Sequence, residues 1–464
     1  MTMNYPIRYM ARVVIEFETP FIVGAGDPDF FSDAVFVADA NGLPALPGSS
    51  IAGVLRHEFA KDYPNAASCF FGYHKKGESK GSRLTISWGC IHDGKNTPVE
   101  GIVRAVRMND SVLRTAFYST ARDHVCITHK GTAKVGGKFD ERVVSAGHRF
   151  TFEMMLEGNE NDSKDWDSLT DLLASNTLRL GGKTRRGYGA FKVISLKKRA
   201  FDLQKPQDFK DFQEHPVELS KSVMMEEIMR EKGRDSSDTT ITATAELRPT
   251  GFWMIGGGAS DEADITPVFE SRIHWTDGHG KPGEEEVLIP GASVKGVLSH
   301  RVAHYHNALE NVFLEDIQAE EIEKYVGSNN TAVRELFGYC KNDDEKETGQ
   351  RGRVFIDDVF IGKPQQKILN HVSLDRFTGG ARTMTGALFS EYPFYKGDGF
   401  TFKLTVSDPK SVSAQARKAL ELALKDLTEE RLPLGLGAGR GNGFFKAANP
   451  IEWSDNGKWI GGGQ

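Results

Sequence analysis

The chain contains two copies of one pattern, and this internal duplication constrains its fold more than any other feature. LPALPGSSIAGVLRHEFA starts at Leu43, and VLIPGASVKGVLSHRVAHY starts at Val287. Pro47 and Pro290 lie 243 residues apart, and the same offset aligns the glycines, serines and histidines that follow them. In both copies a Pro-Gly turn and a serine precede apolar residues at the i, i+3, i+4 and i+8 spacing of an amphipathic helix.

Further segments recur in the same order along the chain. CFFGY, HVCIT and RFTFEM in the first copy correspond to ELFGYC, HVSLD and GFTFKL in the second. Near the end of each copy, LRLGGKTRRGYGAFK corresponds to LPLGLGAGRGNGFFK. Because the matches keep their order while their spacing drifts, we interpret the chain as a tandem duplication with loop insertions.

The duplicated pattern predicts two α+β domains. Each copy opens with an alternating apolar strand, Val13-x-Ile15-x-Phe17 in the first and Ile241-x-Ala243 onward in the second. A glycine-rich turn, the capped helix, short strands and a final glycine-rich loop follow, an order that favours antiparallel sheets covered by helices. We expect a first domain at 1–199, a polar linker at 200–238 and a second domain at 239–464.

Composition and cysteine usage narrow the class of protein. A charged content of 26% and a hydrophobic content of 39% are typical of a soluble globular protein. The net charge is only −6, so a role in nucleic-acid binding requires local basic patches. The four cysteines form no CxxC pair, which argues against a structural zinc site and fits a reducing compartment. No apolar run has the length of a signal peptide or a membrane span, so we expect a cytoplasmic protein.

The glycine-rich segment of the first copy permits two motif interpretations that its sequence does not support fully. GGKT resembles the end of a nucleotide-binding Walker loop, but the glycine that this motif requires at position 177 is Thr177. RRGYGAF matches the first four positions of an RNA-recognition signature from Arg186 to Gly189, and Ala190 then shifts the register. A glycine-rich connection between a loop and a strand remains the simpler interpretation of either match.

Both copies place several glycines and an arginine directly before their last strand, a composition that suits phosphate binding. Exposed backbone amides and a guanidinium bind phosphate oxygens well, and the PG[SA]S helix start adds further N–H groups. A helix cap alone would also explain PG[SA]S. The loop glycines are Gly181, Gly182, Gly187, Gly189, Gly435, Gly437, Gly439 and Gly441. The candidate RNA contacts are Ser49, Ser50, Arg56, Lys183, Arg185, Arg186, Ser293, Lys295, Arg301 and Arg440.

The order of G[AG]G, PG[SA]SxxGxL, LFG and the GxGxxRGxG loop resembles the RAMP superfamily of CRISPR RNA-guided proteins. More narrowly, the chain looks like two fused backbone subunits of a type III CRISPR effector complex, over roughly residues 10–198 and 240–453. The resemblance implies ferredoxin-like, RNA-recognition-like cores with inserted thumb hairpins, expected at 125–144 and 372–388. It also implies guide RNA, target single-stranded RNA and other type III subunits as partners in a hetero-oligomer.

The same resemblance implies cleavage of the paired target RNA at two sites, one per domain. Such subunits use an aspartate between the first strand and the PG[SA]S helix, which corresponds here to Asp33 and to Asp264, with Asp261 as a nearby competitor. One carboxylate can hold Mg²⁺ or Mn²⁺ transiently while RNA and water complete the coordination shell, and the RNA 2′-OH then attacks. No structural metal is expected.

Two other functions remain open at this stage. An inert scaffold would use the same RNA surface without chemistry, and Asp33 would then be an ordinary turn residue. A guide-precursor processing nuclease would need acid–base residues, for which His57, His124 and their counterparts His300 and His371 are candidates. His57 and His300 lie near the apolar stripe of their helices, which favours a structural role. The second copy has Lys295 where the first has Ala52, and Ser299 where the first has Arg56. Arg301 could replace Arg56 in the second copy, so the two copies would contact RNA differently.

Overall fold

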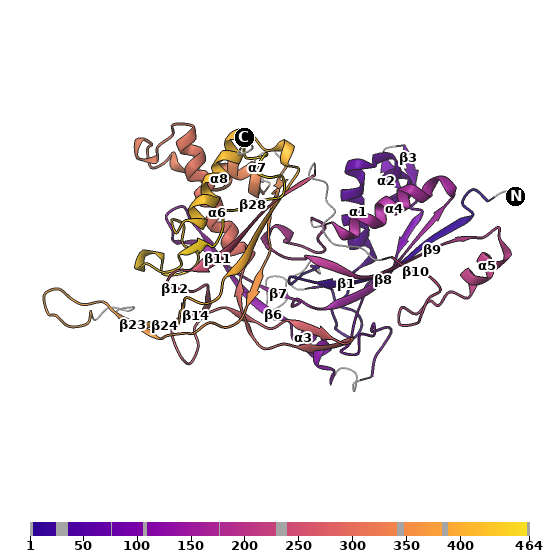
Figure 1. The fold of residues 1–464 in the computed structure, drawn as a ribbon, viewed down its shortest axis with the longest axis horizontal. Helices are drawn as coiled ribbons and strands as arrows, with labels where there is room; N and C mark the ends of the chain where they lie inside the picture. Colours follow the sequence, from indigo (N-terminus) through magenta and orange to yellow (C-terminus); the bar gives the residue numbers. More distant parts are fainter. Residues whose placement is uncertain are drawn as a thin grey trace.

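The computed structural model describes residues 3–24, 36–75, 77–104, 109–175, 177–228, 239–340, 348–382 and 388–461. Figure 1 shows two layered domains side by side, the N-terminal half of the chain at one end and the C-terminal half at the other. Among the described residues, none of the helices combines the length and apolarity that a membrane span requires.

The main sheet of the first domain is antiparallel and has the strand order β10-β9-β1-β8-β4. Its strands are β1 (Ile7–Phe17), β4 (Leu84–Ile86), β5 (Cys90–Ile91), β8 (Arg149–Gly158), β9 (Phe191–Asp202) and β10 (Glu226–Glu227), with β5 also pairing with β8. If β5 and β10 are left out, β1, β4, β8 and β9 are the four core strands in chain order. In the sheet the fourth strand (β9) lies beside the first (β1), and the third (β8) and second (β4) follow. This is the ferredoxin-like arrangement that the resemblance implied.

The second domain repeats this topology with the strand order β21-β26-β11-β27. Its sheet contains β11 (Thr240–Pro249), β21 (Val354–Ile356), β26 (Phe400–Ser407), β27 (Phe445–Ala447) and β28 (Glu452–Trp453). In chain order its four core strands are β11, β21, β26 and β27. The first of them (β11) again lies between the third (β26) and the fourth (β27). The predicted α+β class and the tandem ferredoxin-like domains are therefore confirmed.

Several helices pack against each main sheet and bury its core. The helices are α1 (Gly48–Asp62), α2 (Pro64–Phe71), α3 (Ser111–Phe117), α4 (Ser163–Asp171), α5 (Pro206–Gln213), α6 (Gly291–Leu309), α7 (Thr331–Phe337) and α8 (Ala414–Thr428). In the first domain Leu55 of α1 and Leu169 of α4 join Val13 of β1 in a single apolar core. Leu298 of α6 and Leu424 of α8 occupy the corresponding core of the second domain.

Much of the predicted linker is part of the first domain. Strand β10 extends its sheet, and a strap, defined as residues 214–221, lies over the sheet face opposite the helices. Arg12 of β1 points onto that face because its neighbour Val13 points into the core. The Arg12 guanidinium pairs with Glu153 and donates to the Pro216 and Lys221 carbonyls at 3.1 and 2.6 Å. The strap therefore covers the face on which RNA-recognition domains stack bases, and residues 229–238 lie outside the described residues.

Several smaller two- and three-stranded sheets, some of them hairpins, complete the two domains. They are β2 (Tyr73–Lys75) with β3 (Glu78–Lys80), β6 (Thr120–Ile127) with β7 (Ala133–Val143), β12 (Phe252–Trp253) with β25 (Phe394–Tyr395), β13 (Gly256–Gly258) with β14 (Thr266–Pro267), β16 (Ile273–Thr276) with β17 (His279–Pro282), β19 (Gly338–Tyr339) with β20 (Gln350–Arg351), β23 (Leu369–Val372) with β24 (Leu388–Glu391), and β15 (Phe269–Glu270), β18 (Glu286–Ile289) and β22 (Val359–Ile361) together.

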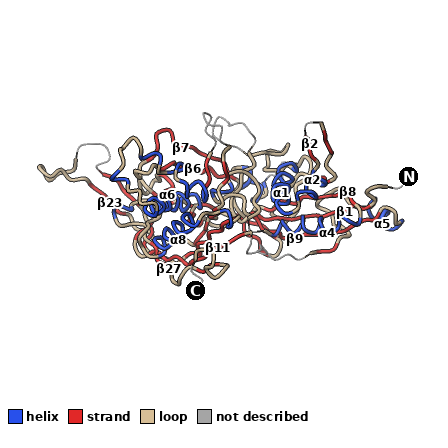
Figure 2. Tube along the Cα trace, turned by 90° about the horizontal axis from the view of Figure 1, so that it is seen from above, coloured by secondary structure: helices blue, strands red, loops and turns tan. Residues whose placement is uncertain are grey.

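Two of these hairpins correspond to the predicted thumbs. The first thumb, β6–β7, begins five residues before the predicted start, at Thr120, and runs beneath the second domain in Figure 1. The second thumb, β23–β24, projects beyond the body of the second domain in both Figure 1 and Figure 2. Residues 383–387 of the second predicted thumb lie outside the described residues.

A buried ion cluster joins the first thumb to the second domain. The Arg122 guanidinium of β6 donates to Glu270 at 2.6 and 2.8 Å and to Asp358 at 2.5 Å. All three side chains are buried. The second oxygen of Asp358 accepts the Gly291 backbone N–H at 2.8 Å, so the same carboxylate also binds the start of α6. Burial raises the pKa of both acids, and the guanidinium between them opposes that rise.

The second domain contacts the first in return through the β16–β17 hairpin. Ile273 donates its N–H to the Ala146 carbonyl at 3.0 Å, and the Trp275 indole donates to the Gly147 carbonyl at 2.7 Å. Gly147 has φ +88°, and a Cβ there would lie 2.0 Å from the Ile273 carbonyl oxygen. Only glycine fits this contact, so the two domains pack through backbone as well as side chains.

Replacing Arg122 with Ala should destabilise the docked arrangement strongly. The change leaves Glu270 and Asp358 buried without their shared cation, which typically costs about 3–5 kcal/mol. Lys138→Ala on the same hairpin is the control, because Lys138 and its partner Asp123 are 69% and 63% exposed and such pairs contribute about 0–1 kcal/mol. Urea unfolding measures both variants. Equal losses of stability would contradict the assigned role of Arg122.

Two buried histidines of the first domain are held neutral. His92 bonds Thr151 and Asn96 through its two ring nitrogens, at 2.6 and 2.9 Å, and burial lowers its pKa to about 4. His148 is fully buried, neither ring nitrogen bonds a described residue, and burial lowers its pKa to about 3. Because these values lie below the ordinary 6.5, the unfolded chain binds protons that the folded chain does not.

Stability should therefore fall as the pH decreases from about 6.5 toward 4, by up to about 1.4 kcal/mol per pH unit for each histidine. His148→Leu removes one buried titrating group and should flatten this dependence, as measured by thermal unfolding midpoints at several pH values. His57→Gln, at an exposed position, is the control and should leave the slope unchanged. A His148→Leu profile identical to that of the parent chain would show that His148 does not titrate in this range.

Candidate nucleic-acid interface

The glycine-rich loops of the two repeats have the same conformation because each packs tightly on its own first glycine turn. Gly181 and Gly435, 254 residues apart, have φ of +96° and +84°. A Cβ on Gly181 would lie 2.4 Å from the Ile22 carbonyl oxygen, and one on Gly435 would lie 2.1 Å from that of Met254. The fold itself thus requires glycine here, independently of any ligand. Positive φ also occurs at Gly187, Gly189, Gly437 and Gly441.

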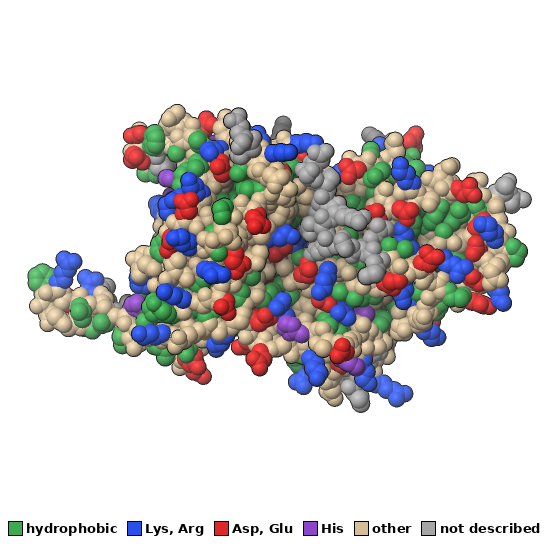
Figure 3. Space-filling model, viewed as in Figure 1, with side chains coloured by type: hydrophobic (Ala, Val, Ile, Leu, Met, Phe, Trp, Pro, Cys, Tyr) green, Lys and Arg blue, Asp and Glu red, His purple; other side chains and the backbone are tan. Residues whose placement is uncertain are grey.

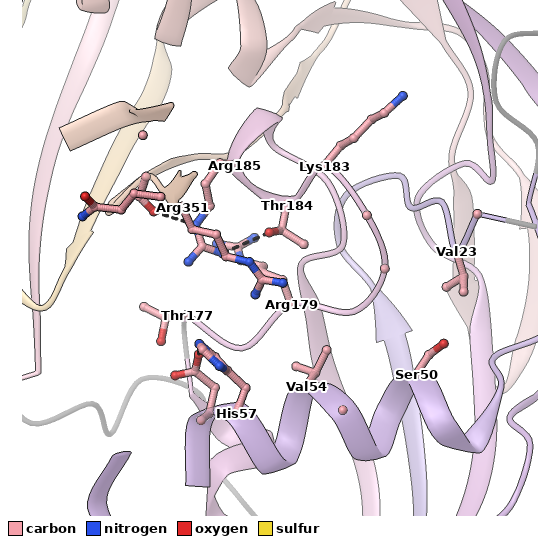
Figure 4. A pocket seen from close by; sticks show the side chains of 18 of the residues that line it. Val23, Ser50, Val54, His57, Thr177, Arg179, Lys183, Thr184, Arg185 and Arg351 are labelled. Carbon is pink, nitrogen blue, oxygen red and sulfur yellow. Dashed lines mark hydrogen bonds and ion pairs between the residues drawn. The ribbon is translucent and has the colours of Figure 1, made fainter. Parts of the chain in front are cut away.

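The loop of the first repeat lines a cleft of about 830 Å³ between the two domains. The start of α1 and the loop form one wall, and the end of α7 with the β19–β20 hairpin forms the other. Figure 4 shows Ser50, Val54 and His57 along α1, below the arginines. The structure brings four of the predicted contact residues together here, Ser49, Ser50, Lys183 and Arg185, beside the loop glycines Gly181 and Gly182.

A second hollow of about 750 Å³ continues the cleft along α1 toward Tyr63. The two hollows share His57, Glu58, Thr177 and Arg185 among their lining residues. The side chain of His57 is 58% exposed and faces this groove, whereas the sequence favoured a structural position for it. Between Ser49 and Asp62 the helix rises by about 20 Å, enough to follow several nucleotides of an extended strand.

The cleft carries positive charge that described acidic residues only partly balance. Arg185 donates from Nε to the Gly352 carbonyl at 2.9 Å and stacks on Phe355 at 4.0 Å. Burial, together with Arg351 and Arg179, lowers the pKa of Arg185 to about 10. Arg179 pairs with Asp357 at 2.6 Å, whereas Arg351 pairs with no acidic side chain of the described segments. Figure 4 shows the three guanidinium groups close together, an arrangement that attracts phosphate.

Other predicted contacts lie elsewhere. Arg56 is exposed on α1 but lines neither hollow. Arg301 pairs with Asp426 of α8 at 3.3 Å, within a contact between helices. Lys295 lies against Phe337, and burial together with Arg186 and Arg185 lowers its pKa to about 8. It thus lies near the loop of the first repeat. Ser293 is partly buried in the first turn of α6.

The aromatic ring of the RNA-recognition-like match is buried. Tyr188 is 1% exposed, its hydroxyl lies 3.1 Å from His124 Nε2, and the Arg122 guanidinium lies 5.3 Å from its ring centre. The ring therefore belongs to the packing of the thumb base and cannot stack on a base. In the second repeat Asn442 occupies the corresponding position. The partial match to the RNA-recognition signature thus reflects a fold similar to that of RNA-recognition domains, and Tyr188 does not provide a base-stacking surface.

Arg186 and Arg440, predicted as RNA contacts, bond buried carboxylates of the thumbs. Arg186 lies 3.3 Å from Glu141 Oε1, and Arg440 pairs with Glu391 Oε1. Lys183 also reaches Glu141, at 2.5 Å, and points away from the arginine group in Figure 4. These contacts tie each glycine-rich loop to the thumb of its own repeat.

Of the two predicted aspartates, Asp264 is described and Asp33 lies outside the described residues. Asp264 Oδ2 accepts hydrogen bonds from the Ser390 backbone N–H at 2.7 Å and hydroxyl at 2.9 Å. These bonds lower the pKa of the Asp264 carboxyl, which keeps it ionised. Asp261, the competitor, is exposed. Gly24 and Phe36, which flank the segment containing Asp33, pair with each other, and Gly24 lines the cleft.

Within the described part of the chain, no three His, Cys, Asp or Glu side chains cluster closely enough to hold a metal ion. An exposed, ionised carboxylate such as Asp264 fits a Mg²⁺ or Mn²⁺ ion that takes its other ligands from water and RNA. The described residues are therefore compatible with an ion that is bound transiently.

Sequence reasoning missed Arg351, Glu141 and Glu391. Arg351 reaches the cleft only because the domains pack against each other, and no local pattern indicates this. Glu141 and Glu391, in contrast, stand in the recurring F-x-E segments FDE and FSE, 250 residues apart. That repeat was available as a signal, although it does not indicate the arginine partner.

Comparison with known proteins agrees with the duplicated architecture. The family model of the RAMP superfamily matches the chain twice, at residues 14–192 and 246–446. The two matched regions contain both thumbs and most of both ferredoxin-like cores, and β9 lies largely beyond the first match. No curated protein sequence matches the chain.

Arg351→Ala should weaken RNA binding more than Arg56→Ala does. Arg351 faces the cleft beside Arg185, whereas Arg56 lies outside it. Loss of one phosphate contact is expected to reduce affinity about fivefold and to lower the salt dependence of log K by about one unit. Fluorescence anisotropy with single-stranded RNA at several salt concentrations measures both quantities. A larger effect of Arg56→Ala would place the RNA on another surface.

Proposed function

Because the chain belongs to the RAMP superfamily, whose members are CRISPR-associated RNA-binding proteins, we propose that it is a double backbone subunit of a type III effector complex. It holds guide RNA and cleaves the complementary target RNA at two positions, one per repeat. The observation that carries this proposal is the cleft where the α1 start, a glycine-rich loop and the arginine group converge between two RAMP domains.

The guide strand runs along the groove between the domains. The start of α1 offers backbone N–H groups and the positive end of the helix dipole, since no side chain caps it. Arg185 and Arg351 add charge from opposite walls. The strap covers the alternative surface, the open sheet face of the first domain, which supports a path through the cleft.

The thumbs support contact with a paired target. At the tip of the second thumb, Phe377 is 99% exposed, and the exposed side chains of Arg376 and Arg382 flank it. Figure 3 shows apolar and basic side chains at this projecting end. An exposed aromatic ring with arginines suits stacking on a base beside phosphates. The first thumb, in contrast, is docked on the second domain through Arg122.

Cleavage in the second repeat proceeds at Asp264. The RNA 2′-oxygen forms a bond to the adjacent phosphorus and the bond to the 5′-oxygen breaks, leaving a 2′,3′-cyclic phosphate and a 5′-hydroxyl. The ionised Asp264 carboxylate accepts the 2′-OH proton directly or through water, and water protonates the leaving oxygen. A bound Mg²⁺ or Mn²⁺ ion supplies charge stabilisation for the phosphate. Asp33 has the same role in the first repeat.

A guide-processing nuclease is a weaker alternative, because the recurring thumb histidines already have partners. His124 bonds the Tyr188 hydroxyl, and His371 bonds Glu391 at 3.0 Å. Burial also lowers the pKa of His124, which disfavours the protonated form that a general acid needs. An inert scaffold remains the competing function from another class.

Alanine substitution of the two aspartates separates cleavage from scaffolding. With guide RNA and partners present, Asp264→Ala should abolish one of two target products, Asp33→Ala the other, and the double variant both. Guide binding should be unchanged in all three. Denaturing gels of labelled complementary RNA, with and without Mg²⁺, measure the products. Unchanged products from the double variant would contradict catalysis by these aspartates and leave the scaffold function.

A further inference from the structure

One group of side chains recurs in both repeats with the same geometry and has no role in the function proposed above. It joins a thumb histidine, aromatic ring and glutamate to the arginine of the glycine-rich loop. We name this group the thumb-base cluster. Its members are His124, Phe139, Glu141 and Arg186 in the first repeat and His371, Phe389, Glu391 and Arg440 in the second.

In the first repeat the cluster centres on Glu141 of β7, which is fully buried. Its Oε1 lies 2.5 Å from Lys183 and 3.3 Å from Arg186, both in the glycine-rich loop. The His124 ring stacks on Phe139 with centroids 5.0 Å apart and an angle of 16°. Arg186 also lies over Phe139, at 5.0 Å.

In the second repeat Glu391 of β24 has the same position and burial. Its Oε1 pairs with Arg440, and its Oε2 lies 3.0 Å from His371. His371 stacks on Phe389 at 4.7 Å and 20°, and Arg440 lies 5.6 Å from the same ring. The histidine lies 3.9 Å from the glutamate in the first repeat and 3.0 Å in the second, and the ring stacking and the arginine contact recur in both, which argues against a chance contact.

A buried carboxylate is costly without a cation, so the cluster constrains the thumb. Arginine remains protonated at all relevant pH values, and each loop arginine therefore stabilises the glutamate only when loop and thumb are in contact. The hairpin base cannot move away from the glycine-rich loop without leaving this charge buried and unpaired or exposing it to water.

In the second repeat the cluster adjoins the candidate site of cleavage. Ser390, next to Glu391 on β24, donates two hydrogen bonds to Asp264. Ile265, next to Asp264, forms a parallel bridge with Glu391. The Asp264 carboxylate is therefore bonded to β24, the strand whose Glu391 side chain is held by Arg440 and His371.

We propose that Arg440, Glu391 and His371 are positioning residues: they fix the thumb base on the glycine-rich loop, and thereby hold Ser390 where it orients Asp264. The cluster of the first repeat fixes the first thumb in the same way. The part that concerns Asp264 rests on the proposed cleavage function, whereas the part that concerns the thumb does not. The loop arginine in this account acts through Glu391, and direct contact with RNA is not its main role.

Hydrogen exchange tests the thumb without any reaction. Glu391→Gln keeps the size of the side chain and removes its charge, so amides in 369–372 and 388–391 should exchange at least about tenfold faster, while those of β6–β7 stay unchanged. Glu141→Gln is the matched control and should show the reverse pattern. Unchanged exchange in both thumbs would overturn the proposal.

Cleavage tests the link to Asp264 within one molecule. Glu391→Gln should reduce the cleavage rate at one target position at least about tenfold. The cleavage rate at the other position and the affinity for guide RNA should stay within about twofold of the values for the parent chain. Arg440→Lys should retain more activity than Arg440→Ala, because a lysine keeps a cation beside the buried Glu391 carboxylate. Equal loss at both positions, or loss of guide affinity in place of rate, would overturn the positioning role. If the parent chain cleaves nothing, the proposed function fails while hydrogen exchange still decides the cluster.

Discussion

The arrangement of the molecule depends on the buried contact of Arg122 with Glu270 and Asp358. Arg122 lies in the first thumb, Glu270 lies in β15, and Asp358 accepts a hydrogen bond from the first residue of α6. Because a guanidinium between two buried carboxylates tolerates little displacement, the contact fixes the first thumb on the second domain. That position in turn sets the first glycine-rich loop against β21 and forms the cleft with β19–β20. The interface is thus what brings two similar domains together around the cleft that we propose as the RNA-binding surface.

The two repeats share a loop conformation but use it differently. Both loops pack on their own glycine turn, and both connect to a buried thumb glutamate through an arginine. Arg179 and Arg185, which face the second domain, are replaced at the equivalent positions by Pro433 and Gly439. In the first repeat these arginines contact the second domain, Arg179 through Asp357 and Arg185 through Gly352. The duplication has therefore conserved the parts that build each domain and changed the parts that join the two.

The sequence predicted the fold well because the duplication exposes the same periodicities twice. The PG[SA]S helix and the glycine-rich loop also meet as expected in the first repeat, since both follow from ferredoxin-like topology. Arg351, the burial of Tyr188 and the exposure of His57 depend on how domains and hairpins pack, which local patterns do not encode. The strap shows the same limit: its polar composition indicated a linker, whereas Arg12 binds its carbonyl groups and holds it on the sheet.

The central claim is that RNA lies in the cleft between the domains. Photo-crosslinking of bound guide RNA followed by mass spectrometry of the crosslinked peptides tests it directly. The account predicts crosslinks in the start of α1, in 181–185 and in the β19–β20 hairpin of the second domain, all lost when excess unlabelled RNA competes. Crosslinks concentrated on the strap and on the sheet face beneath it, with none in the cleft, would contradict the account.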